Sequence, residues 1–154
     1  MIPQIEMPAA LPSPPPLPPP SVPRRFLDLL AAGDFAALEA LFAPDVWLRG
    51  LLVREVHESS TAAGAAAAFR DWVGSPHGAR MLDGEHETSA GRERLRYRFL
   101  VRPKWAPEQW HVIEQTGYCR VKEGRISRLD VACTGYFPAG DDLVAAAGVD
   151  GPGY

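Results

Sequence analysis

The stretch from Trp110 to Tyr136 constrains the fold more than any other part of the sequence. Apolar and polar side chains alternate along Gln109–Lys122 and again along Arg125–Phe137, with Glu123-Gly124 between the two runs. Alternation with a period of two places successive side chains on opposite faces of a strand. The pattern therefore predicts a hairpin of two long antiparallel strands with one buried face, closed by a tight turn.

Two further segments, Met81–Ser89 and Arg92–Arg102, alternate in the same way and predict the neighbouring strands. Before them, apolar residues recur at helical spacing from Phe26 to Phe42, with an interruption at Gly33-Asp34. This predicts two helices, the second capped by Asp34.

We expect Pro44-Asp45 to end the second helix, because the residue before a proline is biased away from helical angles. A strand over Val46–Arg54 follows. Ser59-Ser60-Thr61 then offers an N-cap for an alanine-rich helix over Ala62–Val73, which Gly74-Ser75-Pro76 stops.

The chain divides into three parts. Ten of its sixteen prolines lie in residues 1–23. Residues 1–22 are therefore expected to form a flexible, proline-rich extended arm, which is either a solvated tail or a ligand for a protein module with an aromatic groove. Residues 23–138 form one folded domain, and residues 139–154 are expected to be a flexible tail because they contain few large apolar side chains.

Composition excludes several classes of function. The formal net charge of −3 argues against nucleic-acid binding through a basic surface. Two cysteines are too few for a disulfide framework and favour a reducing compartment. The sequence has neither the basic, apolar start of a secretory signal nor an apolar run long enough for a membrane span. We therefore expect a cytoplasmic protein with no membrane partner.

Three segments resemble the nuclear transport factor 2-like superfamily and its SnoaL-like branch, which includes polyketide cyclase and ketosteroid isomerase-like proteins. They are Phe26–Val46, the helix carrying Gly64, Phe69 and Trp72, and Glu123–Asp130. The likeness spans residues 24–138. It implies an α+β fold in which a cone-shaped, curved antiparallel sheet carries about three N-terminal helices on its concave face. The same scaffold carries isomerases, dehydratases, cyclases, epoxide hydrolases and non-catalytic binding proteins.

The catalytic patterns of these relatives are missing from the sequence. Ketosteroid isomerases have a tyrosine, an aspartate that acts as the catalytic base, and a second acid. The corresponding positions in this chain are Phe26, Gly50 and, in an approximate alignment, Gly117. The Glu-Arg-x-Asp run of limonene epoxide hydrolases is Glu93-Arg94-Leu95-Arg96 here, with arginine in place of the second acid. The histidine and aspartate of polyketide cyclases also have no clear counterpart.

Alternation places Tyr97 with Leu95, Phe99 and Val101 on one face, and the resemblance places His111, Gln115 and Cys119 on the concave side of the next strand. His111 is either an acid–base group or a structural histidine. Gln115 either orients a ligand oxygen or bonds within the core, and Tyr97 either reaches the cavity or packs as core. These three residues are the candidate catalytic set.

The candidate substrate-binding residues complete a mostly apolar pocket. Cys133 is either a nucleophile at the mouth or buried filler, and Arg49 either grips a carboxylate or pairs on the surface. The set is Arg49, Trp47, Phe26, Cys119, Val131 and Cys133. No spacing of histidine or cysteine indicates a metal site, and we expect no organic cofactor.

A row of arginines, Arg92, Arg94, Arg96, Arg98 and Arg102, falls on the opposite face from Tyr97. This outer face is either ordinary polar surface or, as the resemblance implies, the interface of a homodimer.

The sequence thus supports three hypotheses. The first is a small cofactor-independent enzyme of isomerase, cyclase or dehydratase type that acts on a hydrophobic metabolite. The second is a non-catalytic ligand-binding or scaffold protein with the same fold. The third gives the proline-rich arm the main role, with the domain as a dimeric platform.

Overall fold

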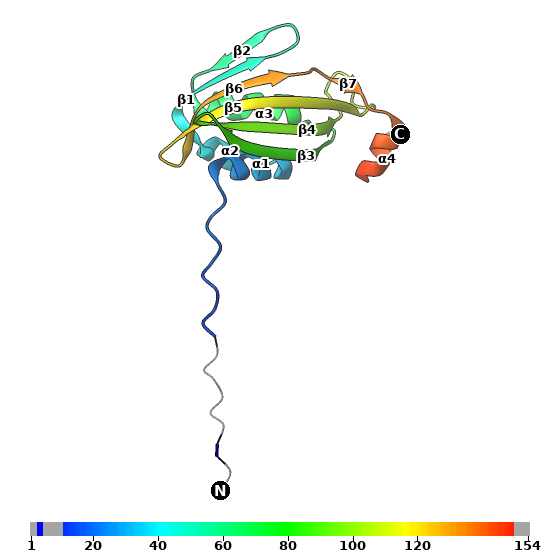
Figure 1. The fold of residues 1–154 in the computed structure, drawn as a ribbon. Helices are drawn as coiled ribbons and strands as arrows, with labels where there is room; N and C mark the ends of the chain where they lie inside the picture. The colour runs from blue at the N-terminus through cyan, green and yellow to red at the C-terminus, as the bar shows by residue number, and fades with distance from the viewer. Residues whose placement is uncertain (1–2, 5–10, 150–154) are drawn as a thin grey trace.

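The computed structural model describes residues 3–4 and 11–149 and shows the expected α+β fold. Its strands form one curved, unclosed sheet in the order β2-β1-β6-β5-β4-β3, and β7 pairs with the start of β5. Figure 1 shows helices α1, α2 and α3 on one side of this sheet. The elements are α1 (Val22–Ala32), α2 (Phe35–Leu41), β1 (Phe42–Leu51), β2 (Val56–Ser59), α3 (Ala62–Val73), β3 (Ala79–Ser89), β4 (Arg92–Val101), β5 (His111–Lys122), β6 (Arg125–Cys133), β7 (Phe137–Pro138) and α4 (Asp141–Ala147).

The helix starts follow the predicted capping chemistry. The Asp34 carboxylate accepts a hydrogen bond from the Ala37 amide at 3.1 Å, and the Thr61 hydroxyl accepts one from the Gly64 amide at 3.0 Å. Each cap satisfies an N–H group that has no partner within its helix. Gly33, with φ of +67°, ends α1 in the left-handed conformation that glycine adopts without a steric penalty.

The first strand differs most from the prediction. Helix α2 already ends at Leu41, and Phe42–Asp45 belong to β1 despite the proline, with an irregular register between Phe42 and Trp47. Strand β1 pairs with β6 in the parallel direction, so the sheet is not antiparallel throughout. Pairing between strands so far apart in the chain is not visible in local alternation.

The hairpin of β5 and β6 is confirmed. Glu123 and Gly124 both have positive φ, 53° and 76°, which is the conformation of the two-residue turns that match the twist of paired strands. Every second residue from His111 to Cys119 is buried. The inner face of β5 therefore includes His111, Gln115 and Cys119, as the family resemblance implied.

Aromatic rings fill the space between helices and sheet. Phe26 lies at the centre, with its ring centroid 5.3 Å from that of Phe69, 6.0 Å from Tyr97 and 6.3 Å from Phe42. All four side chains are almost fully buried. The middle of the domain is therefore solid core, and open space lies toward one end.

The two ends of the chain differ from each other. Residues 11–20 are exposed throughout and lead away from the domain (Figure 1). The C-terminal stretch contains a helix, α4, that its composition does not predict, although none of its residues is buried. The remaining parts of the predicted arm and tail, residues 1–2, 5–10 and 150–154, lie outside the described residues. No helix among the described residues is long and apolar enough to cross a bilayer.

Candidate functional site

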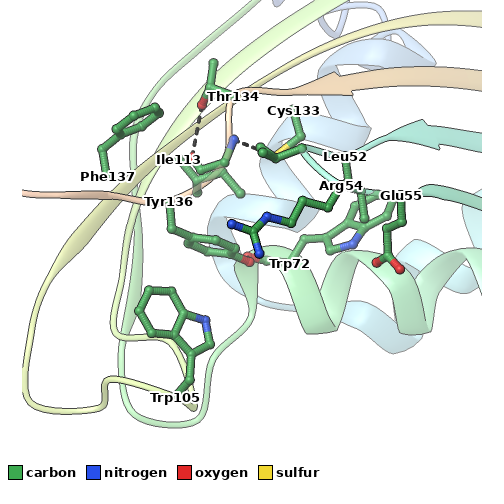
Figure 2. Close-up of a pocket in the computed structure, with 12 residues that line it drawn as sticks. Leu52, Arg54, Glu55, Trp72, Trp105, Ile113, Cys133, Thr134, Tyr136 and Phe137 are labelled. Carbon is green, nitrogen blue, oxygen red and sulfur yellow. Dashed lines mark hydrogen bonds between the residues drawn. The ribbon is translucent and has the colours of Figure 1, made fainter.

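A cavity of about 770 Å³ opens at the end of the domain where β1 and β6 finish. Its walls come from the turn after β1, the C-terminal end of α3, the loop between β4 and β5, and the segment that follows β6 (Figure 2). Its volume lies in the range of pockets that enclose small organic ligands. The lining residues are Leu52, Val53, Arg54, Glu55, Trp72, Trp105, Ile113, Cys133, Thr134, Gly135, Tyr136 and Phe137.

Local contacts hold the aromatic walls in place. The Tyr136 hydroxyl donates a 2.6 Å hydrogen bond to the backbone carbonyl of Trp72, which ties the segment after β6 to the end of α3. The ring of Trp105 stands against that of Tyr136 with centroids 6.0 Å apart and planes at 84°. Gly135 makes the bend possible, because its φ is +86° and a Cβ there would come within 2.6 Å of Val53.

Polar groups at the cavity are few. Burial raises the pKa of Tyr136 to about 12, with a smaller contribution from the charge of Cys133, so Tyr136 is a neutral donor at neutral pH. The Cys133 sulfur accepts a 3.4 Å hydrogen bond from the Gly135 amide. Arg54 and Glu55, both exposed, contribute one charge of each sign. Such a lining suits an apolar or aromatic ligand with a small polar group.

Tyr97 and Gln115 form a buried polar pair behind the cavity wall. The Tyr97 hydroxyl donates to the Gln115 side-chain oxygen at 2.7 Å, and both side chains are almost completely buried. Burial raises the pKa of Tyr97 well above its usual value. Gln115 pairs across the strands with Cys133 and lies two residues beyond Ile113 on the same face, and both of those residues line the cavity. The pair is therefore adjacent to the cavity without lining it.

His111 is buried but lies outside the set of lining residues. Its Nδ1 atom is 3.0 Å from the backbone oxygen of Gln109, and its ring lies 4.9 Å from the ring of Trp105. Of these two neighbouring rings, that of Trp105 lines the cavity and that of His111 does not. The structure thus gives His111 the surroundings of a structural histidine and brings neither Tyr97 nor Gln115 to it.

The predicted binding residues are divided between three environments. Cys133 lines the cavity as predicted. Phe26, Cys119 and Val131 are core residues with at most 2% of their surface exposed. Arg49 and Trp47 correct the sequence interpretation, because Val46, Leu48 and Gly50 take the inner face of β1 and leave both side chains exposed on the outer face.

Sequence reasoning missed the aromatic walls of the cavity. Trp105 lies in the loop between Pro103 and Pro107, and Tyr136 and Phe137 follow the last long strand. Trp105 and Phe137 are 66% and 59% exposed, which is high for side chains of this size. Large aromatic residues in loops at one end of a sheet are the signal that was available in the sequence.

The outer face carries a network of ion pairs. Arg96 contacts Glu114 at 2.6 Å and Glu85 at 3.4 Å, Arg94 contacts Glu87 at 2.9 Å, and Arg98 pairs with Asp83. The acids of β3 therefore pair with Arg94, Arg96 and Arg98, and Arg96 also pairs with Glu114 of β5. Exposed pairs of this kind contribute little stability individually. The homodimer expected from this face stays a prediction.

The two thiols lie in different environments, which predicts selective modification. Burial raises the pKa of Cys119 to about 12, with a smaller contribution from Glu93, whereas Cys133 lies at the cavity. Since thiolates are the reactive form, iodoacetamide at pH 8 is expected to label Cys133 at least about tenfold faster than Cys119 in the folded protein. Peptide mass spectrometry reads the sites. Cys133→Ser should leave the folded chain unlabelled, and equal labelling of both sites would contradict the described cavity.

Neither a protein-family model nor a curated protein sequence matches the chain. Solved structures do match. The structure of Bal32a, from a soil-derived mobile gene cassette, has a TM-score of 0.60 and 16% identity over 82% of this chain and 92% of its own. An NTF2-like protein of unknown function from Mesorhizobium loti has a TM-score of 0.56 and 20% identity over 74% and 88%.

An LEH-like epoxide hydrolase from M. tuberculosis has a TM-score of 0.53 and 14% identity over 73% of this chain and 79% of its own. The chain therefore has the nuclear transport factor 2-like fold. Proteins with this fold include enzymes, but sequence identities of 14–20% do not allow an activity to be assigned to this chain from a structural neighbour.

Proposed function

We propose that this protein binds a small, largely apolar metabolite in the cavity at the open end of its sheet. The observation that carries the proposal is a space of about 770 Å³ walled by Trp72, Trp105, Tyr136 and Phe137. Aromatic walls stabilise a planar or hydrocarbon ligand through dispersion and removal of apolar surface from water. The Tyr136 hydroxyl, whose proton is donated to the Trp72 carbonyl, can accept a hydrogen bond from the ligand, and the Arg54 guanidinium can donate one.

Native mass spectrometry of the protein purified from its own host tests the proposal. We expect an apolar metabolite to remain bound, and its mass identifies the chemical class. Trp105→Ala should weaken binding of that metabolite roughly two- to tenfold, because an aromatic contact contributes about 0.5–1.5 kcal/mol. Trp47→Ala is the matched control, since Trp47 lies on the outer face. Equal loss in both variants, or a protein that never carries or binds an apolar molecule, would contradict the proposal.

A second candidate is a cofactor-independent isomerase, cyclase or dehydratase acting on that metabolite. It is favoured by the Tyr97–Gln115 pair directly behind Ile113 and Cys133, because Gln115 Nε2 is buried without a hydrogen-bond partner among the described residues. A rearrangement of the cavity floor would bring this donor to a ligand oxygen. Once the bound metabolite is known, its conversion by the wild type and by Gln115→Leu distinguishes enzyme from binding protein. His111→Gln tests the acid–base role predicted from the sequence in the same assay.

A further inference from the structure

The proline-rich arm presents one apolar edge to solvent. Seven of residues 11–20 are proline, which favours the polyproline II conformation with three residues per turn. Residues three apart then align, so Leu11, Pro14, Leu17 and Pro20 share an edge. Leu11 and Leu17 are 92% and 91% exposed, although leucine side chains normally avoid water. The arm therefore carries a regular apolar ridge that is exposed to solvent.

The cavity has the chemistry that recognises such a ridge. Polyproline II segments bind between aromatic rings, because flat rings pack against proline and leucine and because the stiff segment loses little entropy on binding. Trp105 and Phe137 are largely exposed at the cavity, and the Trp105 and Tyr136 rings stand nearly perpendicular (Figure 2). The indole N–H of Trp105 and the guanidinium of Arg54 are donors for the backbone carbonyls that a proline-rich segment leaves unpaired.

The direction of the arm favours contact between two copies, because docking in its own cavity would require this stiff segment to fold back along the domain. The arm joins the domain at the first residue of α1, and the last residues of α1, Leu30–Ala32, lie beside Val73 and Gly74, just after cavity residue Trp72. The arm thus begins about 16 Å, one length of α1, from the cavity end. Figure 1 shows it leading away from the domain.

We propose that residues 11–20 of one copy dock in the aromatic cavity of a second copy. This inference goes beyond the proposed binding of a metabolite, because it gives the cavity a second, mutually exclusive occupant. Reciprocal exchange of arms closes a dimer, and one-way docking produces chains of copies. In either case apolar ligands and the arm compete for the same site.

The test uses the full chain with its own ridge removed by Leu11→Ser and Leu17→Ser. A synthetic peptide of residues 11–20 is added to this ¹⁵N-labelled protein, and the indole N–H resonances are followed. We expect the Trp105 resonance to shift in a saturable way while that of Trp47, on the outer face, stays in place. The same peptide with both leucines replaced by serine should cause no shift. No Trp105 shift at millimolar peptide, or equal shifts of Trp105 and Trp47, would overturn the proposal.

A mixing experiment establishes that docking occurs between copies. The unlabelled Trp105→Ala chain keeps its arm but has an impaired cavity, so adding it to the labelled Leu11→Ser, Leu17→Ser chain should reproduce the Trp105 shift. In the wild-type chain the shift should grow with protein concentration. A wild-type shift that is independent of concentration would place the arm in its own cavity and refute exchange. Metabolite binding is measured separately on the ridge-free chain, so failure of either proposal leaves the other testable.

Discussion

Replacing Phe26 with alanine is expected to lower the free energy of unfolding by about 3–5 kcal/mol, the largest single loss we anticipate in this protein. Phe26 is completely buried, and its ring contacts those of Phe42, Phe69 and Tyr97. Removal of the ring loses the free energy gained by burying its apolar surface. It also leaves a space between α1 and the sheet that the rigid aromatic neighbours fill only in part. Urea denaturation measures the change.

Phe137→Ala is the matched control, because the same ring is removed from a side chain that is 59% exposed. Its free energy of unfolding should stay within about 0.5 kcal/mol of the wild type. A Phe26→Ala loss no larger than that of Phe137→Ala would show that the aromatic centre is loosely packed. It would also reopen the sequence-based assignment of Phe26 to the ligand site.

The second large effect concerns the buried pair of Tyr97 and Gln115. Tyr97→Phe removes the hydroxyl that donates to Gln115. The side-chain amide of Gln115 then has no hydrogen bond among the described residues. Gln115→Leu leaves the Tyr97 hydroxyl buried without its acceptor. Each single change is expected to lower the free energy of unfolding by about 1–3 kcal/mol, because a buried polar group without a partner is desolvated with no compensating hydrogen bond.

The double variant Tyr97→Phe, Gln115→Leu should recover most of that loss, because it removes both polar groups of the pair, including Gln115 Nε2, which has no hydrogen-bond partner among the described residues. Thermal and urea unfolding of the four proteins give the coupling energy directly. Tyr118→Phe, an exposed tyrosine on the outer face of the same strand as Gln115, controls for loss of a hydroxyl. A double variant as unstable as the sum of the single changes would contradict the described pair.

The fold was predictable wherever one face of an element is buried. The caps Asp34 and Thr61 follow from local hydrogen-bonding chemistry. Alternation separates the two faces of β5, and the family resemblance indicated which face, from His111 to Cys119, is the inner one. These signals are local, so they are present in the sequence itself. The end of α2 was misplaced because Phe42 extends the helical spacing of apolar residues by one position, although it begins β1.

The cavity was less accessible to sequence reasoning. Its walls are loop residues such as Trp105 and Tyr136, and loops carry no periodicity from which a facing direction follows. Cys133 was placed correctly because it ends β6, and alternation along that strand indicates which face its side chain is on. Trp47 and Arg49 were assigned to the ligand site from their chemistry, but they alternate with the buried Val46 and Leu48 and therefore lie on the outer face of β1.

The parallel pairing of β1 with β6 affects how the protein is made. Strand β1 leaves the ribosome before β2, α3, β3, β4 and β5, and its partner β6 follows only after all of them. Until then Val46 and Leu48 have no complete sheet to pack into, and the nascent chain exposes an apolar strand edge. Such long-range closure makes folding slow, so chains truncated before β6 should be prone to aggregation and degradation.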